Sequence, residues 1–196
     1  MWIGRSAIVK HTFVAARGRP GGVNLGLQRI GVSIWWQGRG GLILSRMKQA
    51  IRTMLKFEDQ PHVIVIHIGG NDLGREKTKV LCDKLREFMS WLAKVMPTTV
   101  LVWSQILPRL QWRYSNNLKA MEKSRVRVNT SIASYLTKSS GCYIRYIKAN
   151  HRFLGEDGVH LSGLGNDVFL NTLQRGIEKI VNNLGVNLTF PGVQSG

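Results

Sequence analysis

The segment HVIVIHI, residues 62–68, limits the folds open to this chain more than any other segment. Its five apolar residues are all β-branched, and four of them follow one another without interruption at 63–66, with Ile68 after His67. A strand with one face in water alternates apolar and polar residues, whereas a strand covered on both faces has an unbroken apolar run. Strands of the second kind lie inside parallel sheets that carry helices on both faces. We therefore expect residues 62–68 to form the central strand of an α/β fold.

Further short apolar runs, bounded by Gly, Pro or polar residues, predict strands at 31–36, 98–107 and 142–147. The three residues ahead of Gly4 predict a truncated first strand. Apolar residues with helical spacing occupy residues 44–55, 81–95, 118–136 and about 162–184. Strands that alternate with helices pair in parallel through right-handed crossovers. The pattern predicts a three-layer α/β/α sandwich, and a chain of 196 residues with 43% hydrophobic residues is suited to one domain, which we expect at 1–185 with a tail at 186–196.

The chain is strongly basic, with 28 Lys and Arg against 11 Asp and Glu. Residues 1–57 contain ten basic side chains and no acidic one. Such an excess attracts polyanions, so RNA or an anionic lipid surface is a possible partner. The basic residues are scattered, without a tight run of five, and a merely solvated surface explains them equally well.

Two cysteines, Cys82 and Cys142, are too few for a disulfide framework or a zinc site and suit a reduced compartment. We expect no metal and no cofactor. The first residues do not make a secretory signal, because Arg5, Lys10 and His11 interrupt any apolar core. No run approaches the roughly 18 apolar residues of a membrane span. These features predict an intracellular, cytoplasmic protein without a transmembrane segment.

Polar and glycine-rich segments follow the expected strands. They are GRS at 4–6, QGRGG at 37–41, GGND at 69–72 and, some ten residues after the last strand, DGVH at 157–160. In parallel sheets, ligands bind beyond the carboxyl ends of the strands. We therefore expect these four segments to converge at one edge of the sheet.

Together the four segments contain the groups that acyl transfer needs. A serine hydroxyl needs an imidazole to take its proton, and a carboxylate orients that imidazole. Ser6, His160 and Asp157 supply these three groups. The oxyanion of the tetrahedral intermediate needs donors already in place. Asn71 and the backbone amide of Gly41 are suitable donors.

The same segments, in this order, resemble the four blocks of the SGNH (GDSL-like) hydrolases, a superfamily of esterases and lipases. The resemblance covers about residues 3–184 and implies a flavodoxin-like sheet of about five strands in the order 2-1-3-4-5. It implies a serine esterase that hydrolyses small acyl esters through an acyl-enzyme intermediate. In that reading Ser6 is the nucleophile, Asp157 and His160 complete the triad, and the Ser6 amide, Gly41 and Asn71 form the oxyanion hole.

Two details qualify the resemblance. Arg5 stands where the first block usually has aspartate, at a position that is not catalytic. Gly38 and Gly40 are alternative sources of the oxyanion amide.

The Gly-x-Ser-x-Gly elbow of α/β-hydrolases is excluded, because Ile8 occupies its second glycine position. The phrases RPGGVNLGL and WWQGRGG further resemble SGNH domains of vertebrate LINE-type retrotransposons, in which an esterase domain accompanies RNA-binding parts.

Several candidate residues have a structural alternative. Ser6 could cap a helix that begins there, Ser162 could cap the last one, and the glycines could serve tight turns. We expect His67 in the core, and likewise the tryptophans of the expected strands, Trp35, Trp36 and Trp103.

The loop PRLQWRYSNN is expected to overhang the edge where Ser6 lies. Trp112 and Tyr114, with Arg109 and Arg113, could line the acyl or alcohol pocket, stack nucleic-acid bases, or do neither. Two alternatives to the esterase remain at this point. One is a retroelement-derived binding module with a weak or inactive triad, and the other is a folded relic.

Overall fold

The sheet has five strands, all parallel, in the order β2-β1-β3-β4-β5. The computed structural model describes residues 1–4, 6–146 and 151–184. The strands are β1 (Trp2–Gly4), β2 (Trp35–Gln37), β3 (Val63–Ile66), β4 (Val100–Ser104) and β5 (Cys142–Ile144). The expected strand order is confirmed. The expected tail at 186–196 lies outside the described residues.

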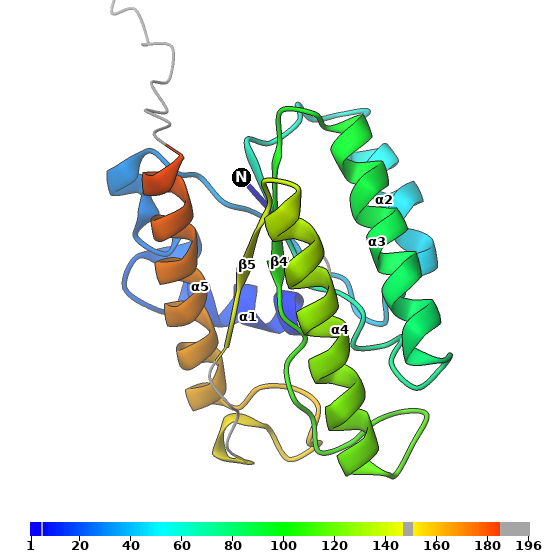
Figure 1. The fold of residues 1–196 in the computed structure, drawn as a ribbon. Helices are drawn as coiled ribbons and strands as arrows, with labels where there is room; N and C mark the ends of the chain where they lie inside the picture. The colour runs from blue at the N-terminus through cyan, green and yellow to red at the C-terminus, as the bar shows by residue number, and fades with distance from the viewer. Residues whose placement is uncertain (5, 147–150, 185–196) are drawn as a thin grey trace, which may run out of the picture.

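Helices cover both faces of this sheet, as the alternating pattern predicts (Figure 1). They are α1 (Ala7–Arg17), α2 (Met47–Met54), α3 (Thr78–Val95), α4 (Leu118–Lys138) and α5 (Gly163–Asn183). Single 3-10 turns occur at η1 (Gly22–Asn24), η2 (Leu27–Ile30), η3 (Leu44–Arg46) and η4 (His151–Phe153). Helices α1 and α5 contribute to one buried cluster, and α2, α3 and α4 to the other. The three-layer sandwich is confirmed. None of the helices in the described ranges combines the length and the apolar character that crossing a membrane requires.

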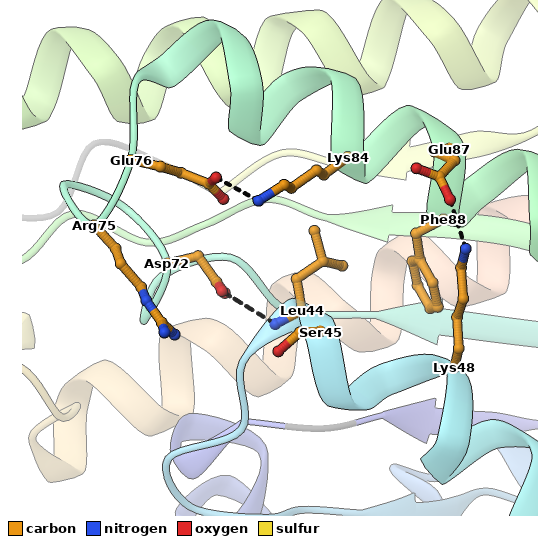
Figure 2. Close-up of a pocket in the computed structure, with 9 residues that line it drawn as sticks. All are labelled: Leu44, Ser45, Lys48, Asp72, Arg75, Glu76, Lys84, Glu87 and Phe88. Carbon is orange, nitrogen blue, oxygen red and sulfur yellow. Dashed lines mark hydrogen bonds and ion pairs between the residues drawn. The ribbon is translucent and has the colours of Figure 1, made fainter.

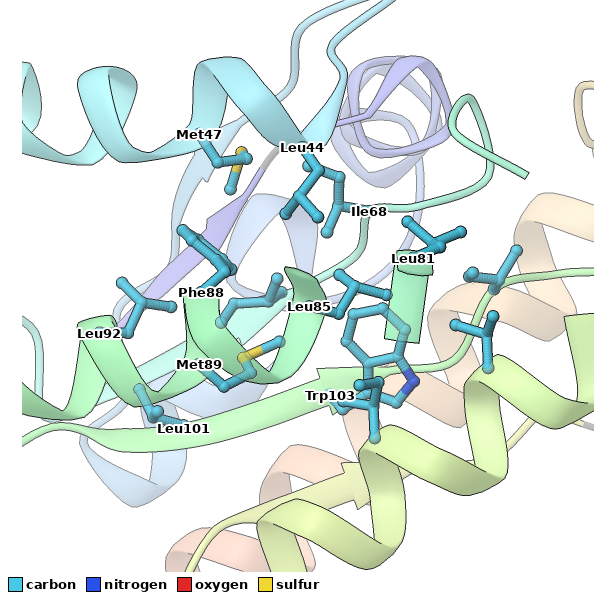
Figure 3. Close-up of a cluster of buried hydrophobic side chains, with 14 of the residues drawn as sticks. Leu44, Met47, Ile68, Leu81, Leu85, Phe88, Met89, Leu92, Leu101 and Trp103 are labelled. Carbon is cyan, nitrogen blue, oxygen red and sulfur yellow. The ribbon is translucent and has the colours of Figure 1, made fainter. Parts of the chain in front are cut away.

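The central strand is β3, and all four of its residues are buried. Ile64 and Ile66 belong to the cluster under α2, α3 and α4, part of which Figure 3 shows around Phe88 and Trp103. Val63 and Val65 face the opposite cluster under α1 and α5. The unbroken apolar run therefore reflects burial on both faces.

Strand β1 has only three residues, yet it lies inside the sheet. Trp2 pairs with Trp35 on one side and Ile64 on the other, and Gly4 pairs with Gln37 and Ile66. All three residues of the strand are buried. Neighbours on both sides thus hold the short strand that leads into Ser6.

The second strand differs from its prediction. It begins at Trp35, and residues 31–34 precede it. Because β2 is an edge strand, Trp35 is 36% exposed and packs edge-on against Trp2. Trp36 is half-buried, and its indole donates a hydrogen bond to the Val23 carbonyl. Of the three tryptophans expected in the core, only Trp103 is fully buried.

Candidate functional site

A cavity of about 540 Å³ opens where the chain leaves the carboxyl ends of the strands. Every strand is followed by a segment that contributes to its wall. The lining residues are Ala7, Ile8, Lys10, His11, Gly40, Gly41, Gly70, Asn71, Arg109, Gln111, Trp112, Arg113, Val159 and His160. We call it the site cavity. The convergence expected from the positions of the four segments is present.

His160 and Asp157 form a hydrogen-bonded pair at this cavity. The imidazole Nδ1 lies 2.5 Å from Asp157 Oδ2, and Asp157 Oδ1 accepts hydrogen bonds from the backbone amides of Val159 and His160. The hydrogen bond with the His160 side chain, followed by those from the two amides, holds the pKa of Asp157 well below its usual range. The carboxylate stays ionised, and an ionised carboxylate orients an imidazole. Among the described residues, His160 Nε2 makes no hydrogen bond, so it is free to accept a proton.

Backbone hydrogen bonds fold the loop that carries this pair. Gly155 N donates to the His160 carbonyl, and Leu110 N donates to the Gly158 carbonyl. Gly158 has a positive φ of 62° and lies against Leu110, so both the conformation and the space require glycine there. The loop is thereby tied to the segment after β4.

Ser6 lies between β1 and the first turn of α1. Its hydroxyl accepts a hydrogen bond from Val9 N at 3.2 Å, and the residue is 7% exposed. The helix cap considered from sequence is therefore present. Ala7 and Ile8 line the site cavity, whereas Ser6 is not among the described lining residues. Within the described ranges no hydrogen bond joins Ser6 to His160, so the pair expected for catalysis is not closed in this structure.

The glycines after β2 have different surroundings. Gly41 has a positive φ of 65° and, like Gly40, open space where a side chain would begin. Both line the site cavity. A side chain at Gly38 would collide with the backbone of Lys10, so this glycine allows the close approach of α1. Gly40 and Gly41 therefore suit an amide donor better than Gly38 does.

Asn71 is held by hydrogen bonds at both ends of its side-chain amide. Its Nδ2 donates to the Leu42 carbonyl at 3.3 Å, and its Oδ1 accepts from the Arg109 guanidinium at 3.4 Å. The same Arg109 nitrogen donates to the Gly70 carbonyl at 3.2 Å. Nδ2 carries two hydrogens and donates one to Leu42, so one hydrogen is left for a further acceptor.

The loop after β4 contributes only part of the expected pocket. Trp112 is buried, lines the cavity and stacks with Arg109, whose guanidinium carbon lies 5.3 Å from the ring centroid. Arg113 also lines the cavity. Tyr114 does not, and it lies beside Gly74 with 42% of its surface exposed. Its place in the pocket is the one expectation for this loop that the geometry does not meet.

Sequence reasoning missed His11. Its ring centroid lies 4.8 Å from that of His160, and it lines the same cavity. Regular apolar spacing did not single out α1 as a helix, so no pattern in the sequence connected residue 11 with residue 160. A second imidazole therefore stands beside the candidate base.

His67 is a core residue, as expected. It is buried, shares a 2.9 Å hydrogen bond with the Ser104 hydroxyl, and packs edge-on against Phe169. Burial, and then the positive charge of Arg109, lower its pKa to about 3, although the Ser104 contact acts in the opposite direction. His67 is therefore neutral at neutral pH.

A second cavity, of about 440 Å³, lies between η3, α2 and α3 (Figure 2). Two ion pairs cross it, Lys84 with Glu76 and Lys48 with Glu87. In its wall Asp72 is buried, and its carboxylate accepts a hydrogen bond from Leu44 N at 3.1 Å. We call it the ion-pair cavity. Asp72 thereby links the loop after β3 to the start of η3. No trio of His, Cys, Asp or Glu in either cavity, or elsewhere in the described ranges, is arranged to hold a metal ion.

The chain matches no model of a known protein family and no curated protein sequence. Several solved structures are similar to it in fold. A GDSL-like lipase from Bacteroides thetaiotaomicron is 20% identical, with a TM-score of 0.66 over 91% of this chain and 87% of that one. A family 3 carbohydrate esterase from Clostridium thermocellum is 18% identical, with a TM-score of 0.68 over 95% and 99%. A lipase/acylhydrolase from Enterococcus faecalis is 14% identical, with a TM-score of 0.69 over 91% and 95%.

At these identities the likeness is one of fold. The structures named above do not bear on the narrower resemblance to retrotransposon domains, which stays a prediction. The α/β/α sandwich of this chain is the fold of GDSL-like lipases and esterases.

Proposed function

We propose that this chain is a serine esterase of the SGNH type that hydrolyses small acyl esters through an acyl-enzyme intermediate. The observation that carries the proposal is the Asp157–His160 pair at the rim of a cavity that Asn71 also lines. The solved structures of similar fold are named as a lipase, a carbohydrate esterase and an acylhydrolase, which supports the same class.

In the proposed reaction, Ser6 Oγ attacks the ester carbonyl while His160 Nε2 takes the hydroxyl proton. The carbonyl oxygen becomes an oxyanion, which the Gly41 amide, the Ser6 amide and Asn71 Nδ2 stabilise. The intermediate collapses, and His160 returns the proton to the departing alcohol. Water then attacks the acyl-enzyme with His160 again as base, which releases the carboxylic acid and restores Ser6.

This sequence requires the Ser6 hydroxyl to donate to His160 when substrate is bound. In the structure the oxygen accepts a hydrogen bond from Val9 N, and the hydroxyl proton remains available. Catalytic hydrogen bonds are often long in unliganded enzymes and shorten in the complex. The position of Ser6 after a strand paired on both sides supports its assignment as nucleophile.

The test is hydrolysis of 4-nitrophenyl acetate together with labelling by a fluorophosphonate probe. Ser6→Ala should abolish the label and the turnover. Because this change also removes a helix cap, which costs about 1 kcal/mol, Asn117→Ala serves as the matched control, since Asn117 caps α4 through the Ala120 amide. The control should keep both signals. Failure of the folded, unaltered protein to react with either reagent would refute the esterase.

Binding of RNA or anionic membranes through the basic surface stays a prediction from composition. Phosphate contacts release counterions, so RNA affinity should fall steeply with rising salt. Several Lys and Arg side chains of the described residues lie within 3.5 Å of a carboxylate, among them Arg29, Lys48, Lys84, Arg86 and Arg125. Part of the positive surface is therefore already compensated, which favours the esterase as the first function to test.

A further inference from the structure

The site cavity contains positive charge without a matching negative charge. Lys10, Arg109 and Arg113 line it, and no Asp or Glu is among its described lining residues. None of the three makes an ion pair with a carboxylate anywhere in the described part of the chain, where the ion pairs join other residues. Asp157 is ionised and near enough to raise the pKa of Arg109, but it forms no ion pair with Arg109 and is not among the described lining residues.

Arg109 is the least solvated of the three cations. A side chain at Gly70 would collide with its guanidinium, and the guanidinium carbon lies 5.3 Å from the centroid of the Trp112 ring. Its acceptors, the Gly70 carbonyl and the Asn71 amide oxygen, are uncharged, and its buried Nε has no hydrogen-bond partner. A guanidinium stays protonated in proteins. Its charge is therefore fixed in the cavity wall, and a poorly solvated charge attracts an anion more strongly than one in water.

Lys10 and Arg113 are exposed, and they come from different elements. Lys10 lies on α1, one turn after Ser6, and Arg113 lies in the loop after β4. Cations that line a cavity wall raise the local concentration of anions and guide them inward. The half-buried Arg109 and the two exposed cations thus line the same cavity.

The geometry points to an acyl ester that carries its own negative charge, a carboxylate or a phosphate, as the substrate class of the site cavity. This inference rests on the esterase proposed above. Because Arg109 contacts Asn71, the charged group would lie close to the reacting carbonyl. A cavity of about 540 Å³ suits a small ester of this kind.

Two pairs of esters test the inference on the two sides of the ester bond. On the acyl side, the 4-nitrophenyl monoester of adipate is compared with 4-nitrophenyl hexanoate, which has the same chain length and no charge. On the alcohol side, 4-acetoxybenzoate is compared with its methyl ester. We expect kcat/KM for the anionic member of at least one pair to exceed that of its neutral partner by about tenfold at low salt, and the ratio to fall as salt is added.

A double variant assigns the preference to the cavity. Lys10→Gln with Arg113→Gln should lower the anionic-to-neutral ratio by about fivefold, as expected for two partly solvated charges. The matched control is Lys94→Gln with Lys138→Gln, which makes the same change in net charge at the far ends of α3 and α4. The control should leave the ratio unchanged. Arg109 is left intact, because any replacement would also remove its contacts with Trp112, Gly70 and Asn71.

Binding gives a second measurement. In Ser6→Ala, 4-acetoxybenzoate should bind more tightly than its methyl ester by calorimetry. If hydrolysis depends on Ser6 but neutral esters are preferred in both pairs, the charge inference is wrong and the esterase stands. If no ester is hydrolysed and no fluorophosphonate label appears, the esterase is wrong, and this inference is overturned with it.

Discussion

The loop after β3 borders two cavities whose charged side chains are arranged in opposite ways. In the ion-pair cavity, Lys84 and Lys48 each lie beside a glutamate (Figure 2). In the site cavity, Lys10, Arg109 and Arg113 have no carboxylate within ion-pair distance among the described residues. Asn71 lines one cavity and its neighbour Asp72 the other.

The difference teaches that a count of basic residues does not show which of them can bind a ligand. Paired cations in the ion-pair cavity hold α2 and the loop after β3 against α3. Unpaired cations in the site cavity are open to an anion from outside. The same residue types therefore have a structural role in one cavity and a recognition role in the other.

The largest expected contrast is in catalysis. His160→Ala should lower kcat for 4-nitrophenyl acetate by about 10⁴-fold or more, since the serine then lacks its base. Lys84 lies in the ion-pair cavity and has no role in the proposed reaction. Lys84→Met should therefore leave kcat within about twofold. Equal losses of kcat in the two variants, measured at matched folded fraction, would contradict the assignment of catalysis to the site cavity.

Asn71 lines the site cavity, and its neighbour in the same loop, Asp72, lines the ion-pair cavity. Asn71→Ala should lower kcat by about 10²- to 10³-fold with little change in KM, because a lost oxyanion donor affects the transition state. Steady-state kinetics measure both constants, with Asn116→Ala, an exposed asparagine, as control. A rise in KM at unchanged kcat would instead indicate a role for Asn71 in ground-state binding.

His67 is buried, and its burial, followed by the positive charge of Arg109, lowers its pKa. Its pKa of about 3 in the fold is below its ordinary value of 6.5, so the unfolded chain takes up the proton first as pH falls. Stability should therefore fall between pH 6.5 and 3, by about 2 kcal/mol at pH 5 relative to pH 7. Urea unfolding measures this loss.

The variant His67→Gln should remove most of that pH dependence, whereas His62→Gln, at an exposed histidine, should keep it. Asp157, whose pKa is lowered, loses its contribution only as pH falls below the ordinary aspartate range near 3.8. The window above pH 5 therefore separates the contribution of His67 from that of Asp157. An unchanged slope in His67→Gln would show that the histidine is not held neutral.

The smallest expected effect is on the free energy of unfolding when a paired or an unpaired cation is removed. Lys84→Met loses a partly exposed ion pair with Glu76 and should cost between 0 and about 1 kcal/mol at low salt. Arg113→Met removes an unpaired cation from a chain of net charge +17 and should cost nothing or stabilise slightly, because it relieves repulsion. Thermal unfolding at low and high salt measures both. A larger loss for Arg113→Met would mean that this side chain has a structural partner.

The fold was largely predictable because its signals are local. The apolar run at 62–68 marked the centre of the sheet, and regular spacing marked α3, α4 and α5. Ser162 caps α5 as expected, through the Gly165 amide. The second strand was predicted to begin too early, at residue 31, because Val32 and Ile34 are apolar and buried although they precede the strand.

The candidate site was predictable as a set of residues but not as a set of contacts. The order of GRS, GGND and DGVH along the chain, at the ends of alternating strands, points to the residues that line or border the site cavity. The Asp157–His160 contact followed from a spacing of three residues in one loop. The position of the Ser6 hydroxyl relative to His160, by contrast, depends on the angle between β1 and α1. No local sequence pattern determines that angle.

The sequence by itself determined the layers of this protein, the order of its elements and the chemical groups that reach one edge of the sheet. Only the tertiary structure decided which charges are neutralised. Arg109 contacts Asn71, and His11 faces His160, through packing between segments far apart in the chain. Periodicity and local turns act over a few residues, whereas a cation becomes paired or unpaired according to which distant segment folds beside it.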